Sequence, residues 1–192
     1  CTSETIGFRL GPRLNAAGRL DHAMRCVQLL TTESDREAMQ IAEQLEQLNR
    51  QRQQIEEGIT AEAGAQLQQD EPAAAIVLGS RDWHLGVVGI VAARLVDRFH
   101  RPSIVIAVDE KGIGKGSART VEGFDLYQGL SACRDLLEAF GGHPNAAGLT
   151  IRESRLDEFR RRFSDVAAQW ATGSLVRPTV HVDAEAKLTD VN

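Results

Sequence analysis

Apolar residues recur at helical spacing through a long polar stretch that begins at Ser34. The apolar positions lie three or four residues apart, with Arg52 filling one position of the series: Ala38, Ile41, Leu45, Leu48, Ile55 and Ile59. This spacing predicts a helix, and Ser34 with Glu37 matches the capping box that begins one. A stripe this thin favours a surface helix, on the order of 50 Å long, that connects two bodies over residues 31–71. A coiled coil is the alternative, which Arg52 and two glycines in the stretch disfavour.

After Pro72 the pattern alternates between short apolar runs and amphipathic segments. The runs predict buried strands and the amphipathic segments predict helices. The expected strands are 73–79, 102–108, one that follows a glycine-broken turn within 109–119, and 149–151; the expected helices are 87–99, Asp125 through Phe140, and one that begins at or near Ser154. The alternation predicts an α/β fold, in which the long connecting helix precedes a compact α/β domain over residues 72–172.

The two flanks differ from this domain. Residues 1–30 are rich in glycine and arginine and hold too little apolar surface to fold alone, which indicates the end of a domain whose bulk lies upstream. Residues 173–192 become strand-like again in "RPTVHVDAEA" and indicate the start of a further domain. The chain is therefore interpreted as a piece of a longer protein.

Composition narrows the class of protein. Hydrophobic residues at 42% and charged residues at 26% are ordinary for a globular protein, and a net charge of -5 excludes a wholly basic surface while leaving room for a local basic groove. No apolar run approaches the roughly 18 residues that a membrane span needs, and no signal segment opens the chain, so a cytoplasmic protein without membrane contact is expected. Three scattered cysteines suggest neither a disulfide framework nor a thiolate zinc site.

Three glycine-rich or arginine-bearing segments, interpreted as loops, carry the candidate chemistry: "GPRLNAAGRL", "GKGSARTVEG" and "GGHPNAAG". Guanidinium, hydroxyl, imidazole and backbone N–H groups all donate hydrogen bonds to anionic oxygen, so together they indicate phosphate binding. The donors are Arg13 and Arg19 in the first segment, Lys115, Ser117 and Arg119 in the second, and His143 with the backbone of Gly141 and Gly142 in the third.

Each of these segments also has a purely structural interpretation. "GKGSAR" could be a solvated hairpin, Gly141 could be the left-handed cap of the helix that ends at Phe140, and His143 could be packed. Trp83 and His84 could form a stacking platform or a buried anchor, of which the anchor is favoured. The sequence holds no P-loop, no dinucleotide-binding glycine motif and no paired Asp/His cluster. It thus indicates phosphate binding without catalytic or metal-binding residues.

Several segments, in order, resemble one family. "WHLGVVGIVAARL", "RPSIVIA", "GKGSARTVEGFDLYQGLSAC" and "FGGHPNAAGLTI" are similar to the DHH-associated domain of the RecJ family of single-strand-specific exonucleases, within the DHH phosphoesterases. "LGPRLNAAGRL" is similar to the end of the family's catalytic domain. The resemblance implies a DHH-domain end at 1–30, a connecting helix at 31–71, a DHH-associated domain at 72–172, and the start of an OB-like nucleic-acid-binding domain at 173–192.

The resemblance also implies an activity and partners. The family removes nucleotides from 5′ ends of single-stranded DNA in repair and recombination, using Mn²⁺ or Mg²⁺ bound by Asp and His motifs that these residues lack. Ser117, Arg119 and His143 would contact DNA phosphates, with Arg13 at the other rim of the cleft. The expected partners are single-stranded DNA and the upstream DHH domain of the same chain, in a monomer. One departure is "GGHPNAAG" in place of the family's usual "GGHAMAAG", which bears on the His143 segment.

Two alternatives remain. One is another DHH phosphoesterase that acts on short oligonucleotides or cyclic dinucleotides, which the long helix and the strand-like tail disfavour. The other is a phosphate-binding or nucleic-acid-binding module with no attached hydrolase.

Overall fold

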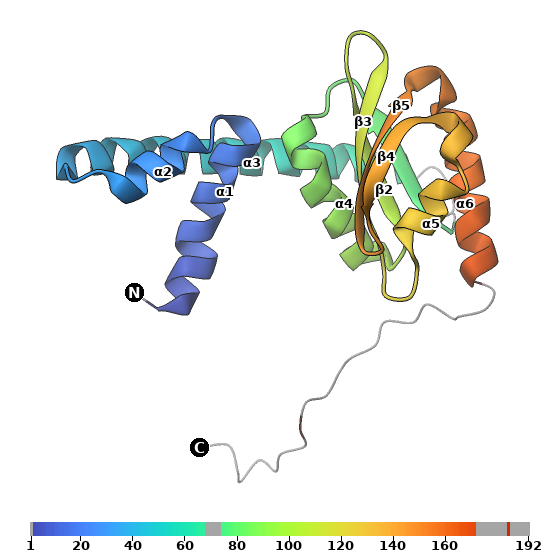
Figure 1. The fold of residues 1–192 in the computed structure, drawn as a ribbon, viewed down its shortest axis with the longest axis horizontal. Helices are drawn as coiled ribbons and strands as arrows, with labels where there is room; N and C mark the ends of the chain where they lie inside the picture. Colours follow the sequence, from blue (N-terminus) through green and yellow to red (C-terminus); the bar gives the residue numbers. More distant parts are fainter. Residues whose placement is uncertain (1, 68–73, 172–183, 185–192) are drawn as a thin grey trace.

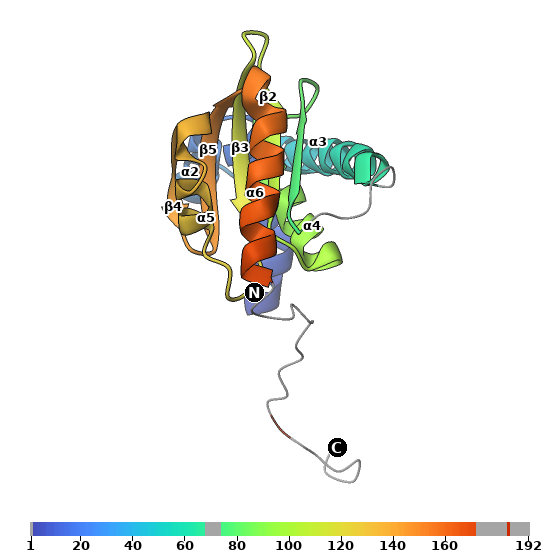
Figure 2. The same cartoon turned by 90° about the vertical axis from the view of Figure 1, so that its right-hand side faces the viewer.

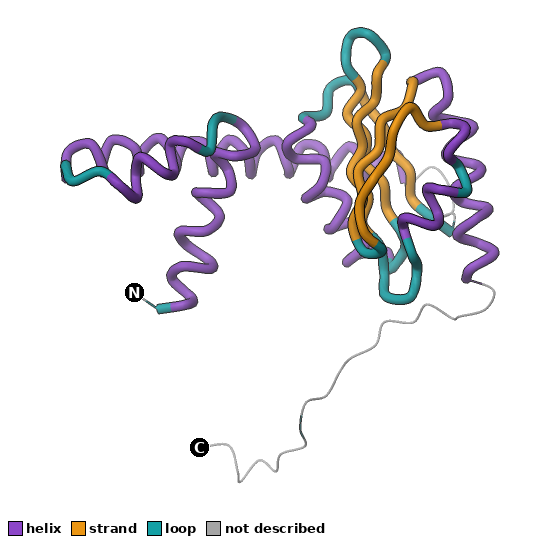
Figure 3. Tube along the Cα trace, in the orientation of Figure 1, coloured by secondary structure: helices purple, strands orange, loops and turns teal. Residues whose placement is uncertain are grey.

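The N-terminal third of the chain is helical (Figures 1 and 3). A computed structural model of the protein describes residues 2–67, 74–171 and 184. The first elements are a π-helix η1 (Thr5–Leu10) and the α-helices α1 (Gly11–Leu20), α2 (Met24–Thr31) and α3 (Asp35–Leu67). Helix α3 extends from the small group of helices at the N-terminus to the sheet domain.

Helix α3 confirms the predicted long helix. It begins at Asp35, where Ser34 Oγ accepts a hydrogen bond from the backbone N–H of Glu37 at 3.3 Å. The Glu37 carboxylate lies 2.5 Å from the Thr32 hydroxyl, so only one half of the expected capping box forms. Residues 68–71, where the helix was predicted to end, lie outside the described residues.

The apolar stripe of α3 contacts two different bodies. Near its start, Ile41 and Leu45 pack with Ala17 of α1 in a small cluster. Near its end, Ile59 and Ala63 join the hydrophobic core of the sheet domain. One thin stripe is sufficient because each half of the helix is covered on one side by a different partner, as a connecting helix requires.

A five-stranded sheet forms the centre of the domain. Its strands are β1 (Ile76–Ser80), β2 (Ser103–Val108), β3 (Ile113–Arg119), β4 (Leu137–His143) and β5 (Ala146–Arg152), in the spatial order β1-β2-β3-β5-β4. The β1–β2 pair is parallel and the remaining pairs are antiparallel. The mixed sheet places β4 at one edge.

Helices cover the two faces of the sheet unequally (Figures 1 and 2). Helix α4 (Leu85–Phe99) packs on one face, here called the α4 face, where its apolar side chains meet Val105 and Ala107 of β2. Helices α5 (Leu126–Ser131) and α6 (Leu156–Ala171) pack on the other face, where Phe159 and Phe163 are fully buried. A 3-10 turn η3 (Glu153–Arg155) precedes α6, so the last helix begins close to the predicted Ser154.

The predicted helix from Asp125 through Phe140 is wrong. Asp125 caps a helix as expected, accepting a hydrogen bond from Gln128 N at 3.0 Å, but α5 ends at Ser131. A 3-10 turn η2 (Arg134–Leu136) follows, and the remaining residues form β4. Apolar residues spaced by three and four favour a helix locally, whereas pairing with β5 and the two poor helix formers after Phe140 favour a strand. Gly141 consequently lies inside β4 and caps no helix.

All three segments interpreted as loops are largely regular structure, and "GGHPNAAG" forms the end of β4 and the start of β5 around a two-residue turn. "GPRLNAAGRL" forms α1, with Pro12 in its first turn, where the missing N–H is tolerated. "GKGSAR" lies in β3, because the turn ends before Ile113. Its glycines are close-packed: a Cβ at Gly114 or Gly116 would lie 2.7 or 2.8 Å from the Ile106 side chain.

The outer boundaries stay predictions. The expected OB-like domain at 173–192 falls outside the described residues except for Ala184. Among the helices that the structure describes, none is both long enough and apolar enough to cross a bilayer.

Candidate nucleic-acid interface

Antiparallel pairing arranges the side chains of β3, β5 and β4 in rows across the α4 face. In the first row Arg119 pairs with Ala146 and Ala146 with His143; in the second row Ser117 pairs with Gly148 and Gly148 with Gly141. Strands lie about 4.8 Å apart, so Arg119 and His143 project from backbones about 10 Å apart. We call this surface the three-strand face; its third row is Lys115, Thr150 and Ala139.

Arg119 is held in position by its own strand. Its Nη1 donates hydrogen bonds to Ser117 Oγ at 3.0 Å and to the Ala118 carbonyl at 2.7 Å. Helix α4 passes directly over this pair at Gly89, where a Cβ would lie 3.0 Å from Ser117 Oγ and 3.4 Å from Arg119 Nη2. A larger residue at position 89 would therefore press on both donors.

A second guanidinium approaches Arg119 from α1. Arg19 is exposed, and its Nη1 donates to the carbonyl of Gly86 in the first turn of α4 at 3.0 Å. Partial burial and the positive charge of Arg19 lower the pKa of Arg119. No carboxylate offsets this repulsion at Arg119 within the described residues. Two cations held close together without a counter-charge favour the binding of an anion.

His143 ends β4 as an exposed side chain on the row of Arg119. The departure from the family pattern falls in the two-residue turn after it, where Pro144 and Asn145 connect β4 to β5. The Pro144 carbonyl accepts a hydrogen bond from Leu126 N, at the start of α5, at 2.9 Å. Because proline suits the first central position of a turn, this departure is compatible with the His143–Ala146 pairing.

The glycine pair before His143 has two different explanations. Gly142 has a φ of +146°, and a Cβ there would lie 2.4 Å from the Ala146 carbonyl oxygen, so the backbone requires glycine. A Cβ at Gly141 would meet nothing within 4 Å. Gly141 is thus free of any packing constraint in the fold.

Arg13 is engaged elsewhere. Its Nε donates to the Glu46 carboxylate of α3 at 2.5 Å, and its Nη1 donates to the Arg9 carbonyl at 2.6 Å. The structure gives Arg13 a role in holding α1 on α3, and joins it by no contact to Arg119 or His143 in the described part of the chain. Its assignment to the rim of a cleft stays a prediction.

Trp83 and His84 support the start of α4. Trp83 is buried, and its indole N–H donates to Glu62 of α3 at 2.7 Å, which is the anchor arrangement. His84 is the N-cap of α4, and its Nδ1 accepts a hydrogen bond from Gly86 N at 3.1 Å. Neither ring forms an open stacking surface with the other.

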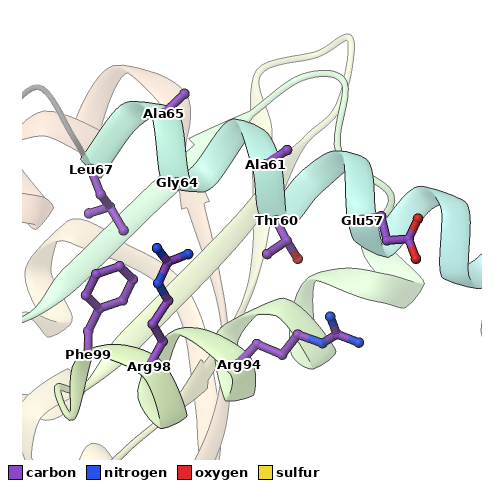
Figure 4. A pocket seen from close by; sticks show the side chains of 9 residues that line it. All are labelled: Glu57, Thr60, Ala61, Gly64, Ala65, Leu67, Arg94, Arg98 and Phe99. Atoms are coloured by element: carbon purple, nitrogen blue, oxygen red, sulfur yellow. The ribbon is translucent and has the colours of Figure 1, made fainter.

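A groove between α3 and α4 also contains arginines (Figure 4). It has a volume of about 470 Å³. Arg94 at its side is paired with Glu56 of α3, Nε to Oε1 at 2.5 Å, and the Arg98 guanidinium lies 5.2 Å from the centre of the Phe99 ring. We interpret this groove as the seam between the two helices.

Sequence reasoning missed three glycines that shape the interface: Gly86, Gly89 and Gly148. Gly89 occurs within the apolar pattern of the helix predicted at 87–99, where glycine costs about 1 kcal/mol relative to alanine, and this cost indicates that close approach requires it. Gly86 lies just before that predicted helix and gave no such signal, although α4 begins at Leu85. Gly148 could be assigned only once its pairing partners on both sides were known.

The fold and the site define a DHHA1 domain, and the chain belongs to that family, which matches residues 70–169. The chain is similar to the single-stranded-DNA-specific exonuclease RecJ of Bacillus subtilis, with 45% identity over 190 residues, covering 98% of this chain and 24% of that protein. The family resemblance of the sequence segments is thereby confirmed. The chain spans between 24% and 35% of the length of the curated relatives it matches.

Solved structures support the same assignment. RecJ of Thermus thermophilus in complex with Mg²⁺ matches with a TM-score of 0.78 and 36% identity, over 86% of this chain and 26% of that one. A structure of exonuclease RecJ bound to manganese matches with a TM-score of 0.78 and 34% identity, over 91% of this chain and 44% of that one. The α/β fold with its long helix is that of these relatives.

Within residues 2–67, 74–171 and 184, no group of three or more His, Cys, Asp or Glu side chains could hold a metal ion. We therefore assign no metal-dependent step to the described residues.

Proposed function

We propose that this chain is the phosphate-gripping part of a single-stranded-DNA-specific 5′-to-3′ exonuclease. The observation that carries the proposal is the Arg119–Arg19 pair: Arg119 is held by Ser117 and Ala118, the positive charge of Arg19 together with partial burial lowers the pKa of Arg119, and no carboxylate offsets this at Arg119 in the described residues. The similarity to RecJ exonucleases over almost the whole chain supports the choice of substrate.

Each donor group contacts the phosphate backbone from a different position on the three-strand face. Arg119 and Ser117 donate to the non-bridging oxygens of one phosphate, and Arg119 is already oriented by its hydrogen bonds to Ser117 and Ala118. Arg19 adds charge from α1, and His143 donates from the far end of the same row. These groups contact backbone and no base edge, so binding is independent of sequence.

The catalytic part of the enzyme lies in the upstream DHH domain. Mn²⁺ or Mg²⁺ bound there would activate water and stabilise the leaving oxygen. Large apolar side chains of the N-terminal helices are exposed and suit a covering domain: Ile6, Phe8, Met24, Val27, Leu30 and Met39. We place the whole protein in the cytoplasm, in DNA repair and recombination.

Binding of a 5′-phosphorylated, fluorescently labelled oligothymidylate to the chain tests this function. Log affinity should fall with log salt by ~0.7 for each phosphate neutralised. Arg119→Ala should weaken binding and reduce that slope, because one charge-assisted contact worth roughly 1.5 to 3 kcal/mol disappears. Arg161→Ala, on α6 across the sheet, is the matched control and should bind as the wild type does.

Three results would contradict the proposal. An affinity that does not change with salt concentration would contradict binding through phosphates. Arg119→Ala with wild-type binding would remove Arg119 from the interface. Equal affinity for a dinucleotide and a long oligonucleotide would favour instead the phosphoesterase of short or cyclic substrates.

A further inference from the structure

The three-strand face continues beyond the row of Ser117 into a hollow. Its volume is about 430 Å³, and it is lined by Lys115, Gly116, Ala139, Phe140, Gly141, Gly148, Leu149 and Thr150. Sites for small organic ligands occupy roughly 300 to 1,000 Å³, so a nucleotide-sized group is compatible with this space. The hollow adjoins the Arg119 site directly, because Ser117 pairs with Gly148 at their shared edge.

A cation stands at the rim of the hollow. Lys115 lies on β3 two residues before Ser117, on the same side of the strand, and is exposed. Two residues along a strand span about 6.7 Å, so Lys115 offers positive charge one short step from the Ser117–Arg119 pair. Thr150 of β5 pairs with Lys115 and brings a hydroxyl group to the same row.

The two glycines on the floor of the hollow, Gly141 and Gly148, are not required by packing. A Cβ at Gly148 would meet only the Gly116 carbonyl, at 3.8 Å, and one at Gly141 would meet nothing within 4 Å. Both residues could therefore carry a side chain in the folded protein. Glycine inside a strand weakens it, and an interior glycine of this kind marks close approach of a ligand or another backbone. Gly114 and Gly116 differ, because side chains already contact them on the other face.

We propose that this hollow binds the nucleotide adjacent to the one whose phosphate is held by Arg119 and Ser117. Lys115 contacts the phosphate of this second nucleotide, Thr150 donates a hydrogen bond to it, and the sugar–phosphate chain lies against Gly148 and Gly141. The single strand thus runs along β3 from the Arg119 row to the Lys115 row. This inference rests on the proposed function and adds the path of the strand.

The positive charge around the hollow and its connection to the Arg119 site favour a nucleic-acid strand as the ligand. The hollow is rimmed by a lysine and opens onto two arginines, which suits a polyanion that crosses both rows. Phe140 and Leu149 also line the hollow, but their side chains pack with the core on the opposite face of the sheet and are not presented as anchors for a protein partner. A single-stranded nucleic acid also explains why Lys115 and Arg119 are spaced along β3, since successive phosphates follow the same direction.

The test compares two probes and four variants of the chain, Arg119→Ala among them. The probes are thymidine 5′-monophosphate, which can occupy only one row at a time and is expected at the two arginines of the Arg119 row, and a 5′-phosphorylated oligothymidylate, which can occupy both rows. Lys115→Ala should leave mononucleotide binding unchanged, weaken oligonucleotide binding, and lower the salt slope for the oligonucleotide by ~0.7. Lys111→Ala, an exposed lysine in the turn before β3, is the matched control and should change neither. Gly148→Val, which fills the hollow, should weaken only oligonucleotide binding.

The outcomes distinguish failure of the proposed DNA path from failure of the proposed phosphate-binding function. If Arg119→Ala weakens both probes while Lys115→Ala keeps the wild-type slope, the strand does not cross the hollow and the inference is wrong. If Arg119→Ala affects neither probe, the proposed function itself fails. Gly148→Val with wild-type oligonucleotide affinity would also overturn the path. Should that variant unfold, the Lys115→Ala slope decides alone.

Discussion

The backbone of Arg19 lies against Gly86 so closely that a Cβ at position 86 would stand 2.2 Å from the Arg19 carbonyl oxygen. Arg19 Nη1 in turn donates to the Gly86 carbonyl at 3.0 Å. The C-terminal end of α1 therefore sits directly on the first turn of α4. This junction determines where Arg19 stands relative to Arg119.

Gly86→Ala should misplace the two arginines without unfolding the domain. The new methyl group meets backbone atoms, which cannot turn aside, so α1 must shift relative to α4. A misplacement of 1 Å can cost up to ~100-fold in rate, and a loss of this order is expected in nuclease assays of the full-length enzyme. Gly18→Ala, whose added methyl would meet nothing within 4 Å, is the control. Full activity of Gly86→Ala would show that the junction does not position the site.

His143→Ala should weaken oligonucleotide binding while the melting temperature stays nearly constant. The imidazole is exposed, and surface substitutions change stability by only about 0.5 kcal/mol. Thermal unfolding and a binding titration on the same preparation check both parts. A large thermal shift with unchanged affinity would assign His143 to packing.

The adjacent glycines should respond oppositely to alanine. Gly142→Ala forces a left-handed backbone and a contact with the Ala146 carbonyl, so a loss of roughly 1 to 3 kcal/mol in the free energy of unfolding is expected. Gly141→Ala should be neutral or stabilise by up to about 1 kcal/mol, since its Cβ meets nothing. Urea denaturation of both variants measures the difference. Equal effects at the two positions would contradict this explanation.

Glu56→Ala should destabilise the seam between α3 and α4. Glu56 is 1% exposed, forms an ion pair with Arg52 of its own helix, and has Arg94 Nε 2.5 Å from its Oε1 in a charge contact without hydrogen-bond geometry. Removing one member of a buried pair leaves the other uncompensated, and a loss of about 3 kcal/mol in unfolding free energy is expected. Exposed Glu57→Ala provides the comparison. Similar stability of the two variants would show that the buried carboxylate contributes little.

The chain alone should hydrolyse no single-stranded DNA when Mn²⁺ is added. Two-metal hydrolysis requires several ligands fixed around ions about 3.5 to 4 Å apart, and the described residues offer no such group. Release of nucleotides is measured by chromatography, with the full-length enzyme as the positive control. Metal-dependent release by the chain would reveal a metal site outside the described residues.

Sequence patterns predicted the parts of the fold that local spacing determines. The stripe through Ile41 and Ile59 identified α3, and the apolar runs identified β1 and β2. The segment from Leu137 to His143 could not be assigned in this way, because its pairing with β5 is non-local and its spacing also fits a helix. Periodicity reflects only local preference, whereas at an edge strand pairing with the neighbouring strand determines the secondary structure.

The candidate site was predicted in its chemistry more than in its geometry. Ser117, Arg119 and His143 were named from motifs, and their shared face follows from the register of three strands. Residue types cannot reveal that Arg13 is engaged by Glu46 while Arg19 is the arginine beside Arg119. Both arginines lie on α1, and only the packing of that helix against α3 and α4 distinguishes them.

The contacts of α1, α3 and α4 close a triangle. Helix α1 contacts α3 at Arg13–Glu46, α3 contacts α4 at Glu56–Arg94, and α4 contacts α1 at Gly86–Arg19. One residue inserted into α3 between Glu46 and Glu56 would turn its two ends by about 100° relative to each other. Seven inserted residues would nearly restore the angle but separate the ends by about 10 Å, which α1 cannot follow. The number of residues along this stretch is therefore as constrained as their identity, and insertions should be tolerated in the turns of the sheet domain and excluded from this side of the triangle.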